Sequence, residues 1–559
     1  MTRASLKKHD SAVESRALKA RRERVATQVR KDKRRQAVQT KRRRLMSTDE
    51  APRASRDIAE LVRVLADTSS ASIDSHQERF DVLREVRVLL SAHEHDYEAV
   101  EKIIESGIVP IMVNLLNSAS PLASATRTGG EVYREILWCL TNIASGQYEH
   151  TKLVLPAVPR LLQFLDGANA TLAEHAAWAL GNIAADCDEF RQQLIASGAV
   201  AALTAQLANP AAEPELAKNC AWALSNIARG HETSAKAFVD AGIVAVLASR
   251  LPVDSAHAFA VDTVVEVAWL LSFLTAREEQ YLQLLLASGL VPLLLPHFAD
   301  ASELLATPIL RVFGNVCCGA ADHHTDEWQL PHVHALLQAD SPFLPRLHAF
   351  LQPDGGAAHL AAESAWVVSN LAALDARVVD VLLDAQLLPL LAQQFHGGSF
   401  EVRREVAFAL ANVALTSAAH LAQVLACDVL AGFLQLLAAA DVALVGNALR
   451  FLENVLRAAP RGVHLVEVNG GIDALERVQF ESSEEHLAAW AAALVNEFYG
   501  ENYGVNSPPS APVAVGERAV PPLSVLQPPP EFAFGAVAAG ASPGGRGRGA
   551  HMTTPAWKK

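Results

Sequence analysis

The chain has 559 residues, of which half are hydrophobic and 6% aromatic, and its formal net charge is −13 at pH 7. A composition this rich in aliphatic residues and this poor in aromatic ones suits stacked helices better than a β-sandwich. The six cysteines form no CxxC pair, no run of 18 uninterrupted apolar residues occurs, and the N-terminus lacks an apolar signal segment. We therefore expect reduced thiols in an intracellular protein, with no membrane span and no export.

Residues 1–46 form a basic arm that holds 17 Lys and Arg against 4 Asp and Glu, a balance of +13. The rest of the chain then carries 31 basic and 57 acidic residues, a balance of −26. The arm has little apolar surface to bury, so we expect it to be disordered alone and to fold only against an acidic partner. The chain's own acidic body is one such partner, and a nucleic-acid arm or a nuclear targeting patch is the alternative.

A short polar linker, residues 47–57, leads into helical sequence from about Ile58. A glycine followed by two aliphatic residues and often by Pro then recurs, each time before an apolar helix. Gly suits the end of one helix and Pro the first turn of the next, so each mark separates two helices. The marks begin at Gly107, Gly198, Gly242 and Gly289, with weaker forms at Leu344-Pro345, Leu388-Pro389 and Gly471-Ile472.

A Trp followed four residues later by Asn recurs at a near-constant interval, with steps of 40, 44 and 47 residues from the first Trp. Repeats of two or three helices in armadillo and HEAT proteins have a period of roughly 40 to 47 residues. The sequence therefore predicts an all-α, right-handed superhelical solenoid of about ten repeats over residues 58–504. The pairs are Trp138/Asn142, Trp178/Asn182, Trp222/Asn226 and Trp366/Asn370, with the altered forms Trp269/Phe273, Arg311/Asn315 and Phe408/Asn412.

Residues i and i+4 share one face of a helix, so stacked repeats turn these pairs into a ladder of rings and amides along one surface. The amides would hold a peptide backbone, and Lys or Arg stems would lie between the indole rings. Glu135, Glu266, Glu363 and Glu405 come three residues before ladder positions, where they would meet the cationic heads. The pattern favours an extended basic peptide as ligand. The alternative is that the tryptophans are core residues and the carboxylates ordinary solvated surface.

The ladder changes in the middle, where Phe273 replaces an Asn and Arg311 replaces a Trp. We expect Arg311 to repel a basic ligand and so to divide the groove into a longer and a shorter site. Two separated sites would take two basic clusters of one peptide.

One repeat is longer than the others, because Asn315 to Asn370 spans 55 residues. The surplus, residues 321–341, contains four histidines near Cys317-Cys318. Their spacing matches no standard zinc motif, so we interpret this stretch as a surface loop without metal. Residues 505–559 are rich in Pro, Gly and Ala, and we expect a disordered tail.

The motifs that carry enzymatic chemistry do not occur: we find no P-loop, nucleophile elbow or paired catalytic carboxylates. We therefore expect neither an enzyme nor a cofactor.

The ordered array of Leu140-Thr141-Asn142-Ile143-Ala144-Ser145-Gly146, Trp178-Ala179-Leu180-Gly181-Asn182, Trp222-Ala223-Leu224-Ser225-Asn226 and Leu310-Arg311-Val312-Phe313-Gly314-Asn315 is similar to importin-α, the armadillo-repeat adaptor of nuclear import. The resemblance extends from about residue 12 to residue 500. It implies a protein that shuttles between cytoplasm and nucleus and binds cargo, importin-β and a nuclear export receptor, with no direct nucleic-acid or membrane partner.

The resemblance also implies roles for individual residues. A major groove for nuclear localisation signals would be formed by Trp138, Asn142, Gly146, Thr151, Trp178, Asn182, Asp186, Trp222 and Asn226, with Gly146, Thr151 and Asp186 as its deepest lysine pocket. A minor groove would be formed by Arg311, Asn315, Glu363, Trp366, Asn370, Glu405, Phe408 and Asn412. The arm resembles the importin-β-binding segment, with Arg21, Arg22, Arg30, Lys31, Lys33 and Arg34 as receptor contacts and Lys41, Arg42, Arg43 and Arg44 as an autoinhibitory pseudo-signal. Glu497-Phe498-Tyr499-Gly500 is similar to the last repeat of the family, where the export receptor docks.

Two departures from the family pattern stand out. Phe408 occupies a position where the family has Trp, and the arm begins with Leu6-Lys7-Lys8 and lacks an aromatic residue there. The alternative function is an armadillo scaffold or chaperone whose arm serves as a nucleic-acid or membrane tether.

Overall fold

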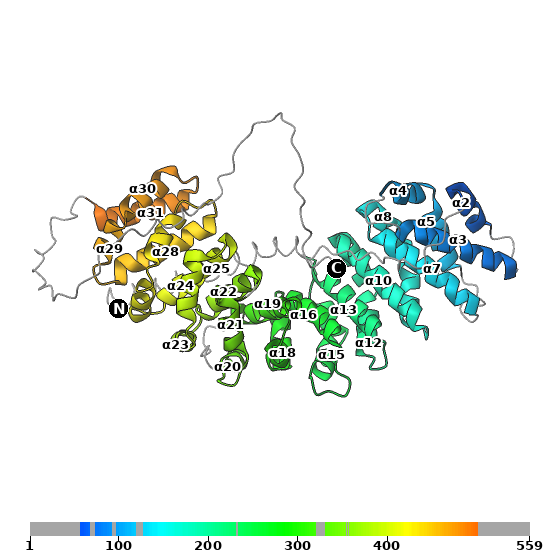
Figure 1. The fold of residues 1–559 in the computed structure, drawn as a ribbon, viewed down its shortest axis with the longest axis horizontal. Helices are drawn as coiled ribbons and strands as arrows, with labels where there is room; N and C mark the ends of the chain where they lie inside the picture. The colour runs from blue at the N-terminus through cyan, green and yellow to red at the C-terminus, as the bar shows by residue number, and fades with distance from the viewer. Residues whose placement is uncertain are drawn as a thin grey trace, which may run out of the picture.

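The computed structural model describes residues 56–500, except 68–72, 92–96, 119–126, 231–232, 320–329, 354 and 356. Within these ranges all regular structure is helical. The helices follow one another in triplets and form a curved arch (Figure 1). This arrangement confirms the predicted armadillo-type solenoid of about ten repeats.

In the middle of the arch, the third helix of each triplet runs along the inner side (Figure 1). Consecutive third helices pack against one another, so the inner surface is continuous along the described repeats. These ten helices are α3 (Ile73–Ser91), α7 (Arg127–Ala144), α10 (Ala170–Asp186), α13 (Pro214–Ala228), α16 (Val261–Leu274), α19 (Glu303–Gly319), α22 (Ala358–Leu371), α25 (Phe400–Ala414), α28 (Val442–Ala458) and α31 (Glu485–Tyr499).

The first and second helices of the middle triplets lie toward the outer side of the arch (Figure 1). The first helices are α4 (Tyr97–Glu105), α8 (Tyr148–Val154), α11 (Asp188–Ala196), α14 (Lys236–Asp240), α17 (Glu279–Ala287), α20 (Pro331–Leu337), α23 (Ala376–Asp384), α26 (Ala418–Leu425) and α29 (Gly462–Val468). The second helices are α2 (Ile58–Ala66), α5 (Ile108–Asn117), α9 (Val158–Leu165, after the 3-10 turn Leu155–Ala157), α12 (Ala199–Ala208), α15 (Ile243–Arg250), α18 (Leu290–Ala299), α21 (Phe343–Leu351), α24 (Leu387–Gly397), α27 (Leu430–Leu436) and α30 (Gly471–Glu481).

The glycine marks in the sequence lie at the junctions between first and second helices, as predicted. Gly107, Gly198, Gly242 and Gly289 have φ between 78° and 84°, a left-handed conformation that glycine adopts at low cost. At two junctions without the glycine, Gln386 and Asp428 take this conformation, each with φ of 57°. In the last repeat Gly470 has the positive φ, and Gly471 begins α30.

The prediction of a surface loop over residues 321–341 is wrong for its second half. Pro331–Leu337 is helix α20, in which Val333 and Leu336 are fully buried. Pro is tolerated in the first turn of a helix, because its missing N–H would have no intrahelical acceptor there. His323 and His324 lie outside the described residues. His332 is buried, and burial lowers its pKa to about 4.

Among the described residues, no group of three His, Cys, Asp or Glu side chains is placed to hold a metal ion. In the same ranges no single helix is long and apolar enough to cross a bilayer. Three strongly bent helix pairs reach the required length and hydropathy only when their two halves are counted together.

Candidate functional site: the inner surface of the arch

The predicted ladder lies on consecutive third helices. The major set is carried by α7, α10 and α13, and the minor set by α19, α22 and α25. The rings of Trp138 and Trp178 are half-buried. Trp222 and Trp366, by contrast, are only 2% and 4% exposed. The expectation of a uniformly exposed array is therefore wrong for these two rings.

The rings of Trp222 and Trp366 rest on glycines of the preceding third helix. A Cβ atom built on Gly181 would lie 2.2 Å from Cζ3 of Trp222, and one on Gly314 would lie 1.9 Å from Cζ3 of Trp366. Any side chain at these two positions would displace the indole. The Gly that precedes Asn182 and Asn315 in the sequence thus sets how closely adjacent repeats approach.

The ladder asparagines join adjacent repeats. From Asn182 onward, each donates its Nδ2–H to the main-chain carbonyl oxygen of the residue three positions after the ladder position on the preceding third helix, whereas Asn142 donates to the hydroxyl of Ser91. The pairs are Asn182 to Thr141 (2.9 Å), Asn226 to Gly181 (3.2 Å), Asn315 to Ser272 (2.9 Å), Asn370 to Gly314 (3.0 Å) and Asn412 to Ser369 (2.7 Å). One N–H of each amide is thereby engaged. A side-chain amide carries a second N–H and a carbonyl oxygen besides, and Nδ2 of Asn315 also donates to Oγ1 of Thr275, 3.0 Å away.

The three residues of the predicted lysine pocket lie together beside this ladder. The hydroxyl of Thr151 on α8 lies 2.8 Å from Oδ2 of Asp186, at the end of α10, and can donate to it. The same hydroxyl is 3.2 Å from the carbonyl oxygens of Ala144 and Gln147. Gly146 lies so close to His150 that a Cβ atom would be 2.5 Å from its Nδ1. The carboxylate of Asp186 and the carbonyl oxygens of Ala144 and Gln147 thus lie around one hydroxyl group. Such a set of hydrogen-bond acceptors suits an ammonium group.

Trp138, the first tryptophan of the ladder, lies between two side chains of the described chain. The guanidinium carbon of Arg87, on α3, is 4.4 Å from the centroid of the Trp138 ring. On the other side of the sequence, the ring centroid of His175, on α10, is 5.7 Å from that of Trp138. Arg87 also forms an ion pair with Glu135, which is fully buried. The interpretation of Glu135 as a contact for a ligand's cationic head is therefore wrong, because Arg87 already pairs with it.

Arg87 is a ladder residue that the sequence analysis missed. Arg87 and Ser91 have the same i, i+4 spacing as Trp138 and Asn142, and Ser91 accepts a hydrogen bond of 3.0 Å from Asn142 Nδ2. Another ladder position, Arg311, also has an arginine in place of tryptophan. The same replacement one repeat before Trp138 was the signal that could have identified Arg87. The step of 51 residues from Arg87 to Trp138 exceeds the period of the repeat, which hid it.

The carboxylates of the predicted minor groove also pair with the chain's own arginines. Arg311 lies 5.0 Å above the ring of Trp269 and forms a 2.8 Å ion pair with Glu363. The expected repulsion of a basic ligand by Arg311 is therefore weakened, because this carboxylate compensates its charge. Arg404 lies 5.8 Å from the ring of Phe408, and pairs at 2.9 Å with Glu405 and at 2.7 Å with Asp441.

The segment similar to the last repeat of the family is fixed by contacts with α28 and α29. Arg457 forms two parallel hydrogen bonds with Glu497, of 2.7 and 2.8 Å, and its guanidinium lies 5.3 Å from the ring of Phe498. The hydroxyl of Tyr499 donates to the carbonyl oxygen of Val463 at 2.9 Å. The predicted arm residues, from Arg21 to Arg44, and the tail over 505–559 lie outside the described residues.

Comparison with known proteins agrees with the repeat assignment. The sequence profile of the Armadillo/beta-catenin-like repeat matches residues 150–185 and 187–229. Importin subunit alpha-9 of Arabidopsis thaliana is 31% identical over 453 residues, which cover 77% of this chain and 81% of the relative. Importin subunit alpha-2 of Oryza sativa subsp. japonica is 31% identical over 445 residues, covering 77% and 80%. A crystal structure of an engineered protein superposes with a TM-score of 0.65 at 24% identity, covering 79% of this chain and 99% of that one, and supports the fold alone.

Proposed function

This chain belongs to the importin-α family, and on that premise we propose that it is a nuclear import adaptor that binds basic localisation signals along the inner side of its arch and links them to importin-β. Membership of this family of adaptors agrees with the expectation that the chain is not an enzyme. The adaptor would shuttle between cytoplasm and nucleus.

The observation that carries the proposal is the acceptor set at Thr151 and Asp186, beside the ladder of Trp138 and Trp178. A lysine of the signal would place its ammonium group against Asp186, and its neighbours would lay their stems beside the half-buried indoles. The amides of Asn142 and Asn182 would hold the peptide backbone without reading its sequence. Steering by the acidic body would make capture fast and sensitive to salt.

A second, shorter site would be formed around Trp366 and Phe408. Because phenylalanine offers a smaller π-face than tryptophan, and because Arg404 lies near the Phe408 ring, we expect this site to bind more weakly than the first. A peptide with two basic clusters would use both sites and gain from the high effective concentration of its second cluster.

The arm would switch the first site. Residues 41–44, Lys-Arg-Arg-Arg, would compete for the groove from their tether, and importin-β would remove them by binding the arm. The export receptor would dock at the last repeat, near Glu497 and Tyr499.

The adaptor function is tested by titrating a labelled peptide with two basic clusters into the full chain, with and without importin-β. The proposal expects tighter binding when importin-β is present, since the arm then no longer competes. If importin-β does not bind, and the arm instead binds acidic polymers such as nucleic acid, the scaffold alternative replaces the adaptor.

A further inference from the structure

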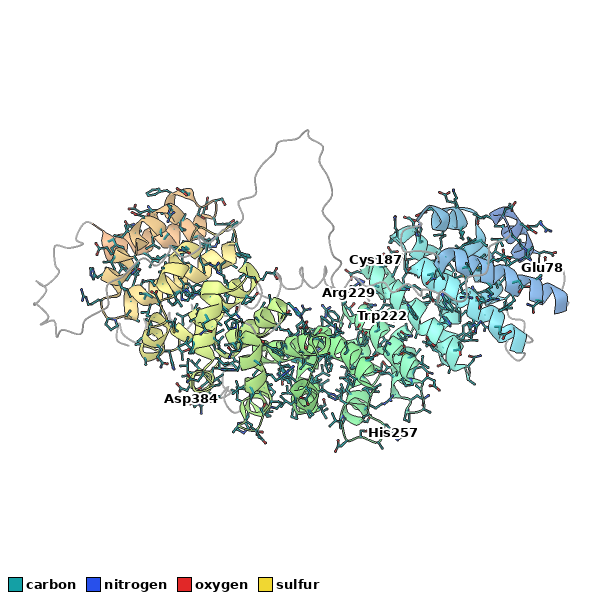
Figure 2. The ribbon with its side chains drawn as sticks, viewed as in Figure 1. Glu78, Cys187, Trp222, Arg229, His257 and Asp384 are labelled. Carbon is teal, nitrogen blue, oxygen red and sulfur yellow. The ribbon has the colours of Figure 1, made fainter. Side chains whose placement is uncertain are left out.

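A cavity of about 300 Å³ lies between the last two repeats, near the starts of α28 and α31. These helices lie at one end of the arch (Figure 1), and Glu78 of α3 marks the other end, with Trp222 between the two (Figure 2). The buried part of the lining is apolar, because Val445, Val478 and Leu487 are only 6%, 4% and 3% exposed. The cavity is thus separate from the proposed signal site, and it suits aliphatic side chains.

Two large apolar side chains are exposed beside this α28/α31 cavity. Val442, the first residue of α28, lines the cavity and is 42% exposed. Phe480, on α30, is 77% exposed and precedes the lining residue Glu481. Exposed apolar side chains that adjoin an apolar cavity are typical of a surface that another segment covers.

Opposite charges also border the cavity. Arg477 and Glu481 lie one turn apart on α30, and both are exposed and line the cavity. Neither side chain forms an ion pair with another residue in the part of the chain that the structure describes. Each can therefore pair with a complementary charge of an occupant. The segment that fits best has aliphatic side chains next to adjacent acidic and basic residues.

Residues 513–520 of this chain, Val-Ala-Val-Gly-Glu-Arg-Ala-Val, have this composition, with Glu517 beside Arg518 and valines on both sides. They are also within reach. Helix α31 begins at the cavity and ends at Tyr499, and its 15 residues span roughly 20 Å. Val513 follows Tyr499 by 14 residues, and an extended chain advances about 3.3–3.6 Å per residue, so the segment can return to the cavity.

We propose that residues 513–520 bind the α28/α31 cavity of the same chain, with a valine in the cavity and with Glu517 and Arg518 beside Arg477 and Glu481. This inference does not depend on the proposed function. Because the segment is tethered at roughly millimolar effective concentration, a weak contact is enough to keep it bound. A partner that docks on this surface of the last two repeats would have to displace the segment.

The test is hydrogen–deuterium exchange of the full chain, measured by mass spectrometry on peptides that cover residues 513–520. The chain is compared with Val442→Glu, which places a charge at the cavity but keeps an acidic residue where a helix start favours it. Val261→Glu is the matched control, since Val261 is also the exposed first residue of a third helix, α16, outside the cavity lining.

We expect the amides of 513–520 to exchange about fivefold to tenfold more slowly in the unchanged chain than in Val442→Glu, as for a local Kd of about 0.1–0.2 mM at that effective concentration. Val261→Glu should keep the slow exchange. Arg477→Glu should speed the exchange, and Arg477→Glu combined with Glu517→Arg should slow it again, because the two charges are then exchanged.

Equal exchange in the unchanged chain and in Val442→Glu overturns the inference, as does an equal acceleration in Val261→Glu. Slow exchange that appears only at high protein concentration also overturns it, because the segment of a second copy then fills the cavity.

Discussion

Arg87 lies over the indole ring of Trp138, with its guanidinium carbon 4.4 Å from the ring centroid, and pairs with the fully buried carboxylate of Glu135. The start of the ladder is thus occupied by a side chain of the protein. Arg311 lies over Trp269 in the same way, 5.0 Å away, in the middle of the ladder. We expect a bound peptide to use the stretch between these two arginines as its main site.

Replacing Arg87 by Met should destabilise the first repeats by about 2–3 kcal/mol, because Glu135 then loses a buried partner. Part of its charge remains compensated by Arg134, 2.9 Å away. The double variant Arg87→Met/Glu135→Leu should recover most of the loss, since no carboxylate is left buried. Thermal unfolding of the three proteins measures this. A double variant as unstable as the single one would contradict the ion-pair explanation.

Gly181→Ala should lower stability and peptide affinity together, because the new Cβ would lie 2.2 Å from the Trp222 ring. Overpacking of this kind costs about 1–3 kcal/mol. Gly446→Ala in α28 is the matched control, since its Cβ would meet only Leu487 at 3.6 Å. That change should stabilise the chain by up to about 1 kcal/mol, through helix propensity alone. Urea unfolding compares the two variants, and equal effects would contradict the close packing of Trp222 on Gly181.

Acidification should destabilise the repeat that contains His332, because burial lowers the pKa of this imidazole from its ordinary 6.5 to about 4. The folded protein then binds fewer protons than the unfolded chain between these two values. Stability is therefore unaffected above pH 6.5 and falls as the pH drops toward 4, by up to about 3 kcal/mol. His332→Phe should show a smaller loss between pH 7 and pH 5 in urea unfolding. Parallel pH profiles for the two proteins would show that His332 does not carry the effect.

Lys41→Ala together with Arg42→Ala should raise the affinity of the full chain for a basic peptide, by about tenfold if the arm competes at roughly millimolar effective concentration. Saturating importin-β should abolish the difference between this variant and the unchanged chain. Fluorescence anisotropy of a labelled peptide measures both affinities. Equal affinities without importin-β would refute autoinhibition.

The repeat architecture was predictable because it depends on periodicity: Trp178 and Trp222 recur at the armadillo interval, and glycines such as Gly198 mark the helix junctions. The partners of the ladder side chains were not predictable. Glu135 resembles the other carboxylates in the sequence, and only the packing of α3 against α7 brings Arg87 to it. The burial of Trp222 likewise follows from the close approach of α10, and a helical pattern does not reveal how far apart two helices lie.

The binding of a labelled Lys-Lys-Lys-Arg-Lys peptide to residues 50–505, beside the variants Asp186→Lys and Asp166→Lys, tests the central claim most directly. Asp166 is exposed at the end of α9, so its variant makes the same charge change away from the pocket. We predict micromolar or tighter binding that Asp186→Lys abolishes and Asp166→Lys largely keeps. Absence of binding, or equal loss in both variants, would contradict a basic-signal site at Asp186.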